Sequence, residues 1–134
     1  MKEKDFQADF GKLNRINGVF ELKICKGTSL PFDALADHQE EGLVEASIGD
    51  GVYHKLSDIG GSSGTGKKPF DCFRLQGINA FVVVQFYEFR KKKNVYYIRI
   101  QDWIHMRKYA GRKSMTESMA IDEAVIKENY IGRL

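Results

Sequence analysis

The sequence predicts an α/β fold in which a mixed β-sheet is flanked by helices. Short runs rich in β-branched and aromatic residues, bounded by turn residues, dominate the middle of the chain. Stretches with apolar residues at helical spacing lie at both ends and between the first two of these runs. Helices placed in this way imply a sheet with helices packed on it. The 134 residues are long enough to bury one core, so 1–134 is expected to form a single domain.

Spacing and turn residues divide the chain into elements. The expected elements are helices over 3–14, 32–46, 102–109 and 114–129, and strands over 19–25, 51–57, 70–75, 80–89 and 94–101. Pro31 suits the opening of the second helix, and Ser114 and Glu117 have the spacing of a capping box at the start of the last one. Residues 82–84 are apolar on both faces, which is typical of a central strand. The glycine-rich stretch 60–66 is expected to be a flexible loop.

The charge is modest in sum and uneven along the chain. The net charge is +3, yet 31–58 carries seven acids against one base, and 90–113 carries nine bases against Asp102 alone. A basic surface of that size attracts a polyanion, although a solvated hairpin and helix face would give the same pattern. The basic residues proposed to contact nucleic acid are Arg90, Lys91, Lys92, Lys93, Arg107, Lys108, Arg112 and Lys113.

The composition also indicates in which cellular compartment the protein is expected. The longest apolar run, 80–84, is too short to span a membrane. The charged N-terminus lacks the apolar segment of a secretory signal, and the two cysteines make neither a disulfide framework nor a metal-ligand spacing. A cytoplasmic protein with reduced cysteines, and with no membrane partner, is therefore expected.

One charged pair stands out, Glu21 and Lys23 in the strand over 19–25. Side chains of a strand alternate between its faces, so Glu21 and Lys23 are expected to share one face while Phe20, Leu22 and Ile24 take the other. Such charges are costly to bury unless they are paired or bind something. A divalent metal and a phosphate would satisfy both, and a simple solvated face is the alternative.

A second acid, Asp71, heads the apolar strand over 70–75. If it reaches Glu21, two carboxylates and a lysine are able to hold magnesium, position a water and stabilise the charge that develops on a phosphate during cleavage. The alternative is a strand-edge residue with no such role.

Several blocks of the chain together resemble a known family. Phe20 to Lys23, Thr28 to Pro31 and the pair His38-Gln39 follow one another as in the central block of RecU-type Holliday junction resolvases. These enzymes belong to the PD-(D/E)xK nuclease superfamily. Lys68 to Phe73 and Arg112 to Glu117 are similar to blocks of short phage-encoded relatives.

The resemblance implies a restriction-endonuclease-like fold, Mg²⁺ (for which Mn²⁺ substitutes) and a homodimer acting on branched DNA. It implies Glu21 as a metal ligand, Lys23 as the catalytic lysine and Gln39 as an active-site helper. The family carries its first acid on a strand before this one, for which the chain leaves no room. Asp71 is the predicted replacement. One of Glu3, Asp5 and Asp9 in the first helix is expected to add a further metal ligand, and Asp9 is the one chosen.

The predicted function is therefore a magnesium-dependent DNA endonuclease, most simply a Holliday-junction resolvase of DNA recombination, encoded by a phage or prophage. Two alternatives stay open. One is a catalytically inactive nucleic-acid-binding module on the same fold. The other is a nuclease of plain duplex or single-stranded DNA.

Overall fold

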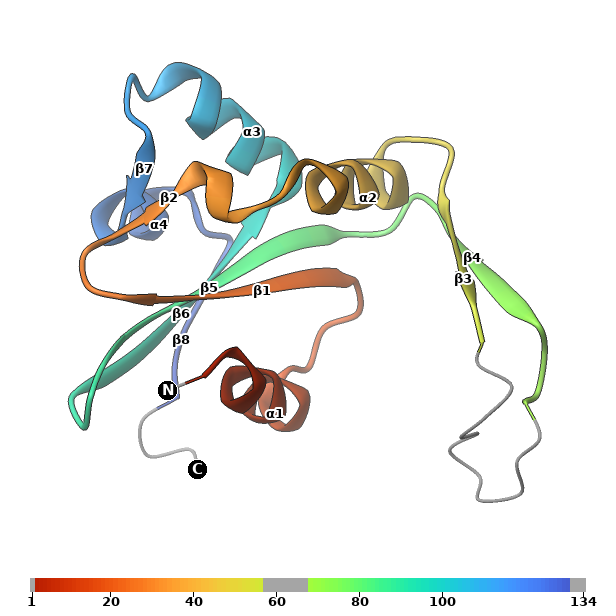
Figure 1. Cartoon of the computed structure of the whole chain (residues 1–134), viewed down its shortest axis with the longest axis horizontal. Helices are drawn as coiled ribbons and strands as arrows, with labels where there is room; N and C mark the ends of the chain where they lie inside the picture. The colour runs from red at the N-terminus through yellow and green to blue at the C-terminus, as the bar shows by residue number, and fades with distance from the viewer. Residues whose placement is uncertain (1, 57–67, 131–134) are drawn as a thin grey trace.

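A computed structural model describes residues 2–56 and 68–130, and shows a mixed sheet with helices on both faces (Figure 1). The elements are α1 (Glu3–Leu13), β1 (Val19–Lys26), β2 (Ser29–Pro31), the 3₁₀ turn η1 (Phe32–Ala34), α2 (Asp37–Ser47), β3 (Val52–Lys55), β4 (Cys72–Leu75), β5 (Ala80–Glu88), β6 (Lys92–Arg99), α3 (Ile100–Tyr109), β7 (Ser114–Thr116), α4 (Glu117–Glu123) and β8 (Ile126–Asn129). None of the described helices has the length and apolar character needed to cross a bilayer. The glycine-rich stretch predicted at 60–66 lies outside the described residues.

The main sheet has the strand order β1-β5-β6-β8. β1 runs parallel to β5, with Glu21 opposite Val82 and Lys23 opposite Val84, whereas β5–β6 and β6–β8 are antiparallel. The predicted α/β class and the mixed sheet are confirmed. The three valines at 82–84 are fully buried, as expected for a central strand covered on two sides.

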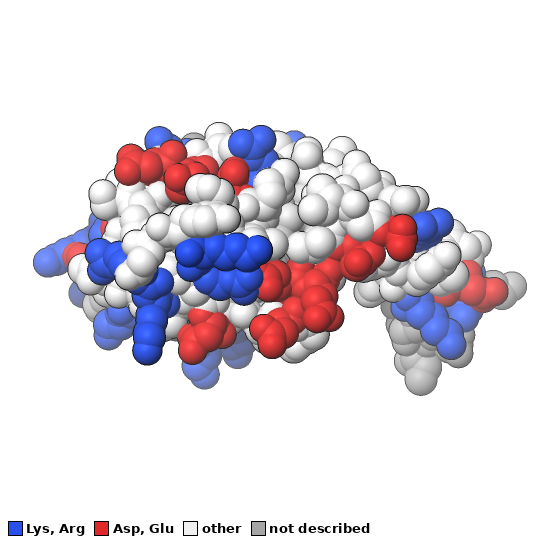
Figure 2. Space-filling model, turned by 90° about the horizontal axis from the view of Figure 1, so that it is seen from above, with Lys and Arg blue, Asp and Glu red and all other residues white. Residues whose placement is uncertain are grey.

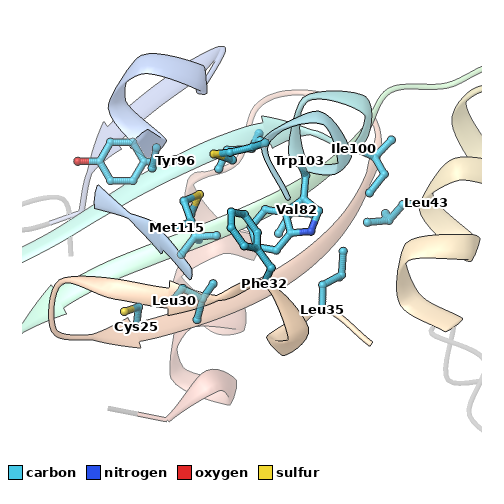
Figure 3. Close-up of a cluster of buried hydrophobic side chains, with 14 of the residues drawn as sticks. Cys25, Leu30, Phe32, Leu35, Leu43, Val82, Tyr96, Ile100, Trp103 and Met115 are labelled. Carbon is cyan, nitrogen blue, oxygen red and sulfur yellow. The ribbon is translucent and has the colours of Figure 1, made fainter. Parts of the chain in front are cut away.

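Each face of the sheet has its own apolar layer. On one face α1 packs Phe6 and Phe10 against β5 and β6, and Phe20, Leu22 and Ile24 of β1 join this layer. On the other face α2, α3 and the short β2–β7 pair cover Val82 and Val84. Figure 3 shows Val82 among the side chains of this layer. The alternation predicted for β1 is therefore present, and Glu21 and Lys23 point to the α2 face together with the buried Cys25.

β3 and β4 pair with each other and form no part of the main sheet. Figure 1 shows this hairpin projecting from the body beyond the end of α2. The strands predicted over 51–57 and 70–75 are therefore present in shortened form, and they lie outside the main sheet.

Two helix predictions differ from the structure. The helix predicted over 32–46 begins only at Asp37, after the turn η1. The helix predicted over 114–129 is wrong at both ends: Thr116 caps it, with its Oγ1 accepting from the Met119 N–H at 3.2 Å, and the chain leaves it after Glu123. Ile126–Asn129 is a strand instead, because the edge of β6 offers it backbone hydrogen-bond partners.

Candidate functional site

The ExK pair lies on β1 directly beneath α2. β1 is the first strand of the sheet, and its Glu21 and Lys23 project from the face that α2 covers. Their side chains keep 27% and 13% of their exposure, so the lysine is largely buried at the edge of the core. The Lys23 Nζ lies 3.5 Å from the Glu21 Oε1.

Gln39 of α2 links these two charges. Its Nε2 donates to the Glu21 Oε1 at 2.9 Å, and its Oε1 accepts from the Lys23 Nζ at 3.0 Å. The same Oε1 accepts from the backbone N–H of Ala36 at 3.0 Å. Because two donors hold the amide oxygen, the amide nitrogen is oriented toward Glu21. We call Glu21, Lys23 and Gln39 the ExK cluster.

The sequence-predicted acids do not join the ExK cluster. Asp71 lies at the far end of the β3–β4 hairpin, with a side chain that is 89% exposed and an ion pair of 3.3 Å to Lys68. Asp9 belongs to α1, on the opposite face of the sheet from Gln39, and its carboxylate lies 3.8 Å from the Lys93 Nζ. No group of three or more His, Cys, Asp or Glu with the geometry of a metal site occurs among the described residues.

The ExK cluster offers a divalent ion one carboxylate, that of Glu21. Glu21 has its Oε2 free of the contacts that hold Oε1, whereas the Gln39 carbonyl oxygen is already occupied by two donors. Mg²⁺ sites in proteins use one or two carboxylates together with waters or substrate phosphates. The ExK cluster thus supplies one carboxylate, the lower end of that range, and Lys23 lies beside the same carboxylate.

A groove of mixed charge, called the α2 groove below, lies beside the N-terminus of α2. It has a volume of about 610 Å³ and is lined by Phe32, Asp33, Leu35, Ala36, Asp37, Arg107, Arg112 and Lys113. Figure 2 shows lysine and arginine side chains next to acidic ones on one face of the molecule. Ala36 connects the groove to the ExK cluster, because its N–H binds Gln39.

Of the basic residues predicted to contact nucleic acid, some form ion pairs with acidic side chains and others do not. Arg107 is held by Glu40 at 2.8 Å, Lys92 by Glu117 and Lys93 by Asp9. The remaining ones form no ion pair with another described residue, and they are Arg90, Lys91, Lys108, Arg112 and Lys113. Arg90 lies over the exposed ring of Phe89, 5.0 Å from its centroid, at the β5–β6 turn.

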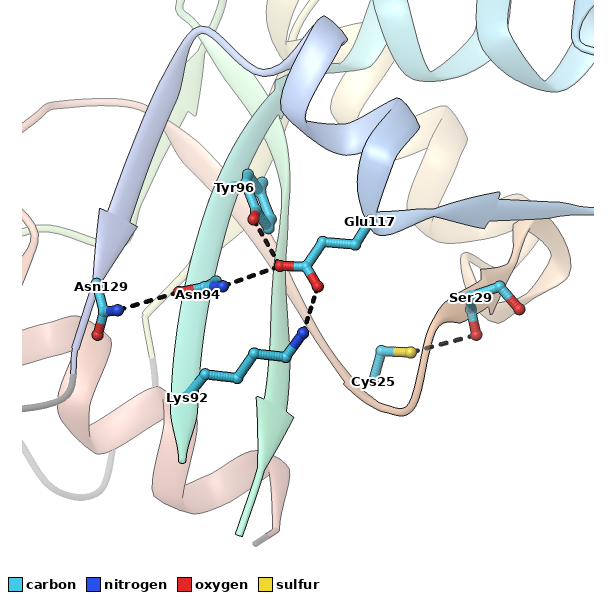
Figure 4. A network of polar contacts seen from close by, with 7 residues as sticks. All are labelled: Cys25, Ser29, Lys92, Asn94, Tyr96, Glu117 and Asn129. Carbon is cyan, nitrogen blue, oxygen red and sulfur yellow. Dashed lines mark hydrogen bonds and ion pairs between the residues drawn. The ribbon is translucent and has the colours of Figure 1, made fainter. Parts of the chain in front are cut away.

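A second polar cluster, centred on Glu117, was not predicted. Its Oε1 accepts from the Lys92 Nζ at 2.5 Å, and its Oε2 accepts from the Asn94 Nδ2 at 2.9 Å and the Tyr96 Oη at 2.6 Å (Figure 4). Lys92, Asn94 and Tyr96 alternate along β6, a visible sequence signal for one polar face. Their partner is more than twenty residues away in the chain, and no local pattern points to it.

Hydrogen bonding determines how the groups around Glu117 titrate. Burial alone would raise the pKa of Glu117, but hydrogen bonds from Lys92, Tyr96 and Asn94 outweigh it and lower that pKa. The hydrogen bond to Glu117 also raises the pKa of Lys92. Burial and the adjacent carboxylate raise the pKa of the Tyr96 phenol well above its usual value.

Comparison with known proteins adds no relative. No protein-family model, curated protein or solved structure matches the chain.

Proposed function

We propose that this chain is a metal-dependent DNA endonuclease with a restriction-endonuclease-like fold, acting on branched DNA as a Holliday-junction resolvase. The observation that supports it is the ExK cluster. A carboxylate and a lysine lie on one face of a strand beside a parallel partner, and a glutamine from the next helix contacts both. This arrangement agrees with the resemblance of residues 19–45 to the nuclease superfamily.

Each residue of the ExK cluster has a distinct part in the proposed hydrolysis. Lys23 is largely buried, so its ammonium acts at short range on the negative charge that grows on a phosphate in the transition state. Glu21 supplies a carboxylate oxygen for an ion or an attacking water. Gln39 binds both charges and so fixes their positions beside each other, at the 3.5 Å of their ion pair.

In this proposal the phosphate backbone approaches the ExK cluster along the α2 groove, on the side of its cations and away from Asp33 and Asp37. Arg112 and Lys113 form no ion pair with described residues, so their charges are available to phosphate oxygens. Arg107 is fixed by Glu40, which orients its guanidinium along the groove wall. Contacts of this kind position DNA without reading its sequence.

Cleavage of a synthetic four-way junction tests the proposal. We expect cutting by the wild type with Mg²⁺ or Mn²⁺, little cutting of a linear duplex or single strand, and none by Glu21→Gln. Glu41→Gln is the matched control, because Glu41 is an exposed acid of α2 outside the cluster. Equal cutting of junction and linear DNA would show a general nuclease instead, and cutting by Glu21→Gln would remove the assigned site.

The second candidate function is nucleic-acid binding without cleavage. It is favoured by the single carboxylate of the ExK cluster, because one acid with a competing lysine is a weak ligand set for a hard cation. Salt-dependent junction binding by the wild type, with no cutting at any Mg²⁺ or Mn²⁺ concentration, would establish this function and exclude the enzyme.

A further inference from the structure

The outer edge of β1 is open. β1 is eight residues long and pairs only with β5 among the described strands. Unpaired N–H and C=O groups along a strand of that length form a template for another strand. The ExK cluster therefore lies directly at a place where the sheet is able to continue.

The ladder with β5 determines which groups of β1 point outward. Val19 is opposite Ala80, and its N–H donates to the Asn79 oxygen at 2.8 Å, toward β5. Alternate residues of a strand direct their backbone groups to opposite sides. Glu21 and Lys23 share the parity of Val19, so Phe20, Leu22 and Ile24 present their N–H and C=O groups to the open edge.

The sequence of β1 is complementary to itself in one antiparallel register. With Leu22 opposite Leu22 of a second copy, the outward residues form hydrogen-bonded pairs, and Glu21 stands opposite Lys23 of that copy. A shift by two residues in either direction places Glu21 opposite Glu21, or Lys23 opposite Lys23. Opposite charges across a strand pair stabilise it and like charges destabilise it, so the charges select the register about Leu22.

We propose that two copies of this chain pair antiparallel through their β1 edges about a two-fold axis at Leu22, which joins their two ExK clusters into one site. On the α1 face the same register brings Phe20 against Ile24 of the second copy, covering apolar side chains that are only partly buried in one chain. The four-stranded sheet then continues across the axis.

The pairing also supplies the carboxylate that one chain lacks. Glu21 of one copy is the diagonal neighbour of Glu21 of the other, at about 7–8 Å between Cα atoms. The Oε2 atoms of the two Glu21 side chains, which Gln39 and Lys23 leave free, are the ones that would bind one divalent ion between the copies. This second step rests on the proposed function, whereas the strand pairing does not.

Charge reversal tests the pairing. We expect the wild type to sediment as a dimer, and Glu21→Lys or Lys23→Glu alone to raise the dimer dissociation constant by about tenfold or more, because two symmetric pairs become repulsive. Mixing the two variants restores opposite charges at both positions, so heterodimers should form. A monomeric wild type, or a mixture that stays monomeric while both variants are folded by circular dichroism, overturns the pairing.

Disulfide trapping gives a second test that does not depend on those charges. Facing residues of a non-hydrogen-bonded pair have Cα atoms about 4.5 Å apart, within the range that a disulfide spans. Glu21→Cys and Lys23→Cys, carried by copies of different mass, should cross-link as a heterodimer on oxidation. Glu41→Cys in place of Glu21→Cys is the control. Cross-linking of Glu21→Cys with itself through the native Cys25 would show the shifted register and overturn the one proposed.

Manganese alone tests the shared carboxylates. Mn²⁺ should lower the dimer dissociation constant of the wild type and leave that of Glu21→Gln unchanged. If Mn²⁺ leaves the dimer dissociation constant of the wild type unchanged, the two Glu21 carboxylates do not share an ion. None of these measurements uses DNA cleavage, so loss of the nuclease proposal leaves the pairing result intact, and loss of the pairing leaves the cleavage test intact.

Discussion

Glu21 and Glu117 lie on the same face of the sheet, each beside a lysine and a side-chain amide, yet their surroundings differ. Glu117 uses both oxygens and accepts three hydrogen bonds. Glu21 uses one oxygen, which accepts from Gln39, with Lys23 at 3.5 Å. A carboxylate with both oxygens in hydrogen bonds to a neighbouring element holds elements together, and a carboxylate with a free oxygen remains available for a ligand. This difference is the reason why the proposed function rests on Glu21, whereas Glu117 is expected to hold α4 against β6.

The largest expected effect is on stability, from Glu117→Ala. The change leaves Lys92, Asn94 and Tyr96 without their common acceptor and detaches α4 from β6. Breaking a largely buried, hydrogen-bonded pair costs several kcal/mol, and the 28% exposure of Lys92 reduces this, so we expect a loss of about 3 kcal/mol. Urea denaturation measures it.

Glu123→Ala is the matched control, because Glu123 is an exposed acid of the same helix. Its unfolding free energy should change by about 0.5 kcal/mol or less. Equal losses in the two variants would mean that the Glu117 cluster does not hold α4 in place.

Acid should weaken the same cluster. The pKa of Glu117 is lower in the folded protein than its unfolded value, so its contribution is complete above the unfolded pKa and is lost as pH falls through the folded one. The melting temperature of the wild type should therefore fall on acidification, and Glu117→Gln should show a flatter acid profile. Calorimetry over that pH range makes the comparison, and parallel profiles for the two proteins would contradict it.

Tyr96→Phe is expected to have a smaller effect. It removes one of three donors to Glu117 and leaves the ring packing in place, so about 1 kcal/mol of unfolding free energy should be lost. A loss as large as that of Glu117→Ala would show that the phenol, and not the carboxylate, organises the cluster.

The smallest effect on stability should come from Glu21→Gln. The amide preserves the shape of the side chain at a partly exposed site, so the unfolding free energy should change by about 0.5 kcal/mol or less. Junction cleavage should nevertheless be lost. A stability loss near that of Glu117→Ala would place Glu21 among the structural carboxylates.

Local patterns predicted the main sheet better than its periphery. In β1 the alternation of apolar and charged residues indicates which face is buried, and in β5 the apolar run indicates burial on both faces. Both patterns follow directly from burial. The helix prediction for Ile126–Asn129 was wrong, because what makes this segment a strand is its pairing with β6. That strand lies about thirty residues earlier in the chain, so no local pattern reveals the pairing. The β3–β4 hairpin has strand-like sequence, but nothing local indicates that it leaves the sheet.

The candidate site was predicted in part for the same reason. Glu21 and Lys23 follow from strand alternation, and the structure brings Gln39 to them from the next helix. Asp71 required a long-range placement that its own strand does not specify, and the hairpin carries it to an exposed position. The three donors around Glu117 alternate on β6, but their acceptor directly follows β7, a strand that pairs with β2 and not with β6.

The separation of the β3–β4 hairpin from the sheet has a consequence for local unfolding. The hairpin pairs with itself and adjoins α2, and a two-stranded hairpin is marginally stable alone. Its amide protons should therefore exchange with solvent through local opening. Those of β5, buried on both faces, should exchange only when the whole domain unfolds. The protein then has two cooperative units, and a partner that binds the hairpin could order it without changing the ExK cluster.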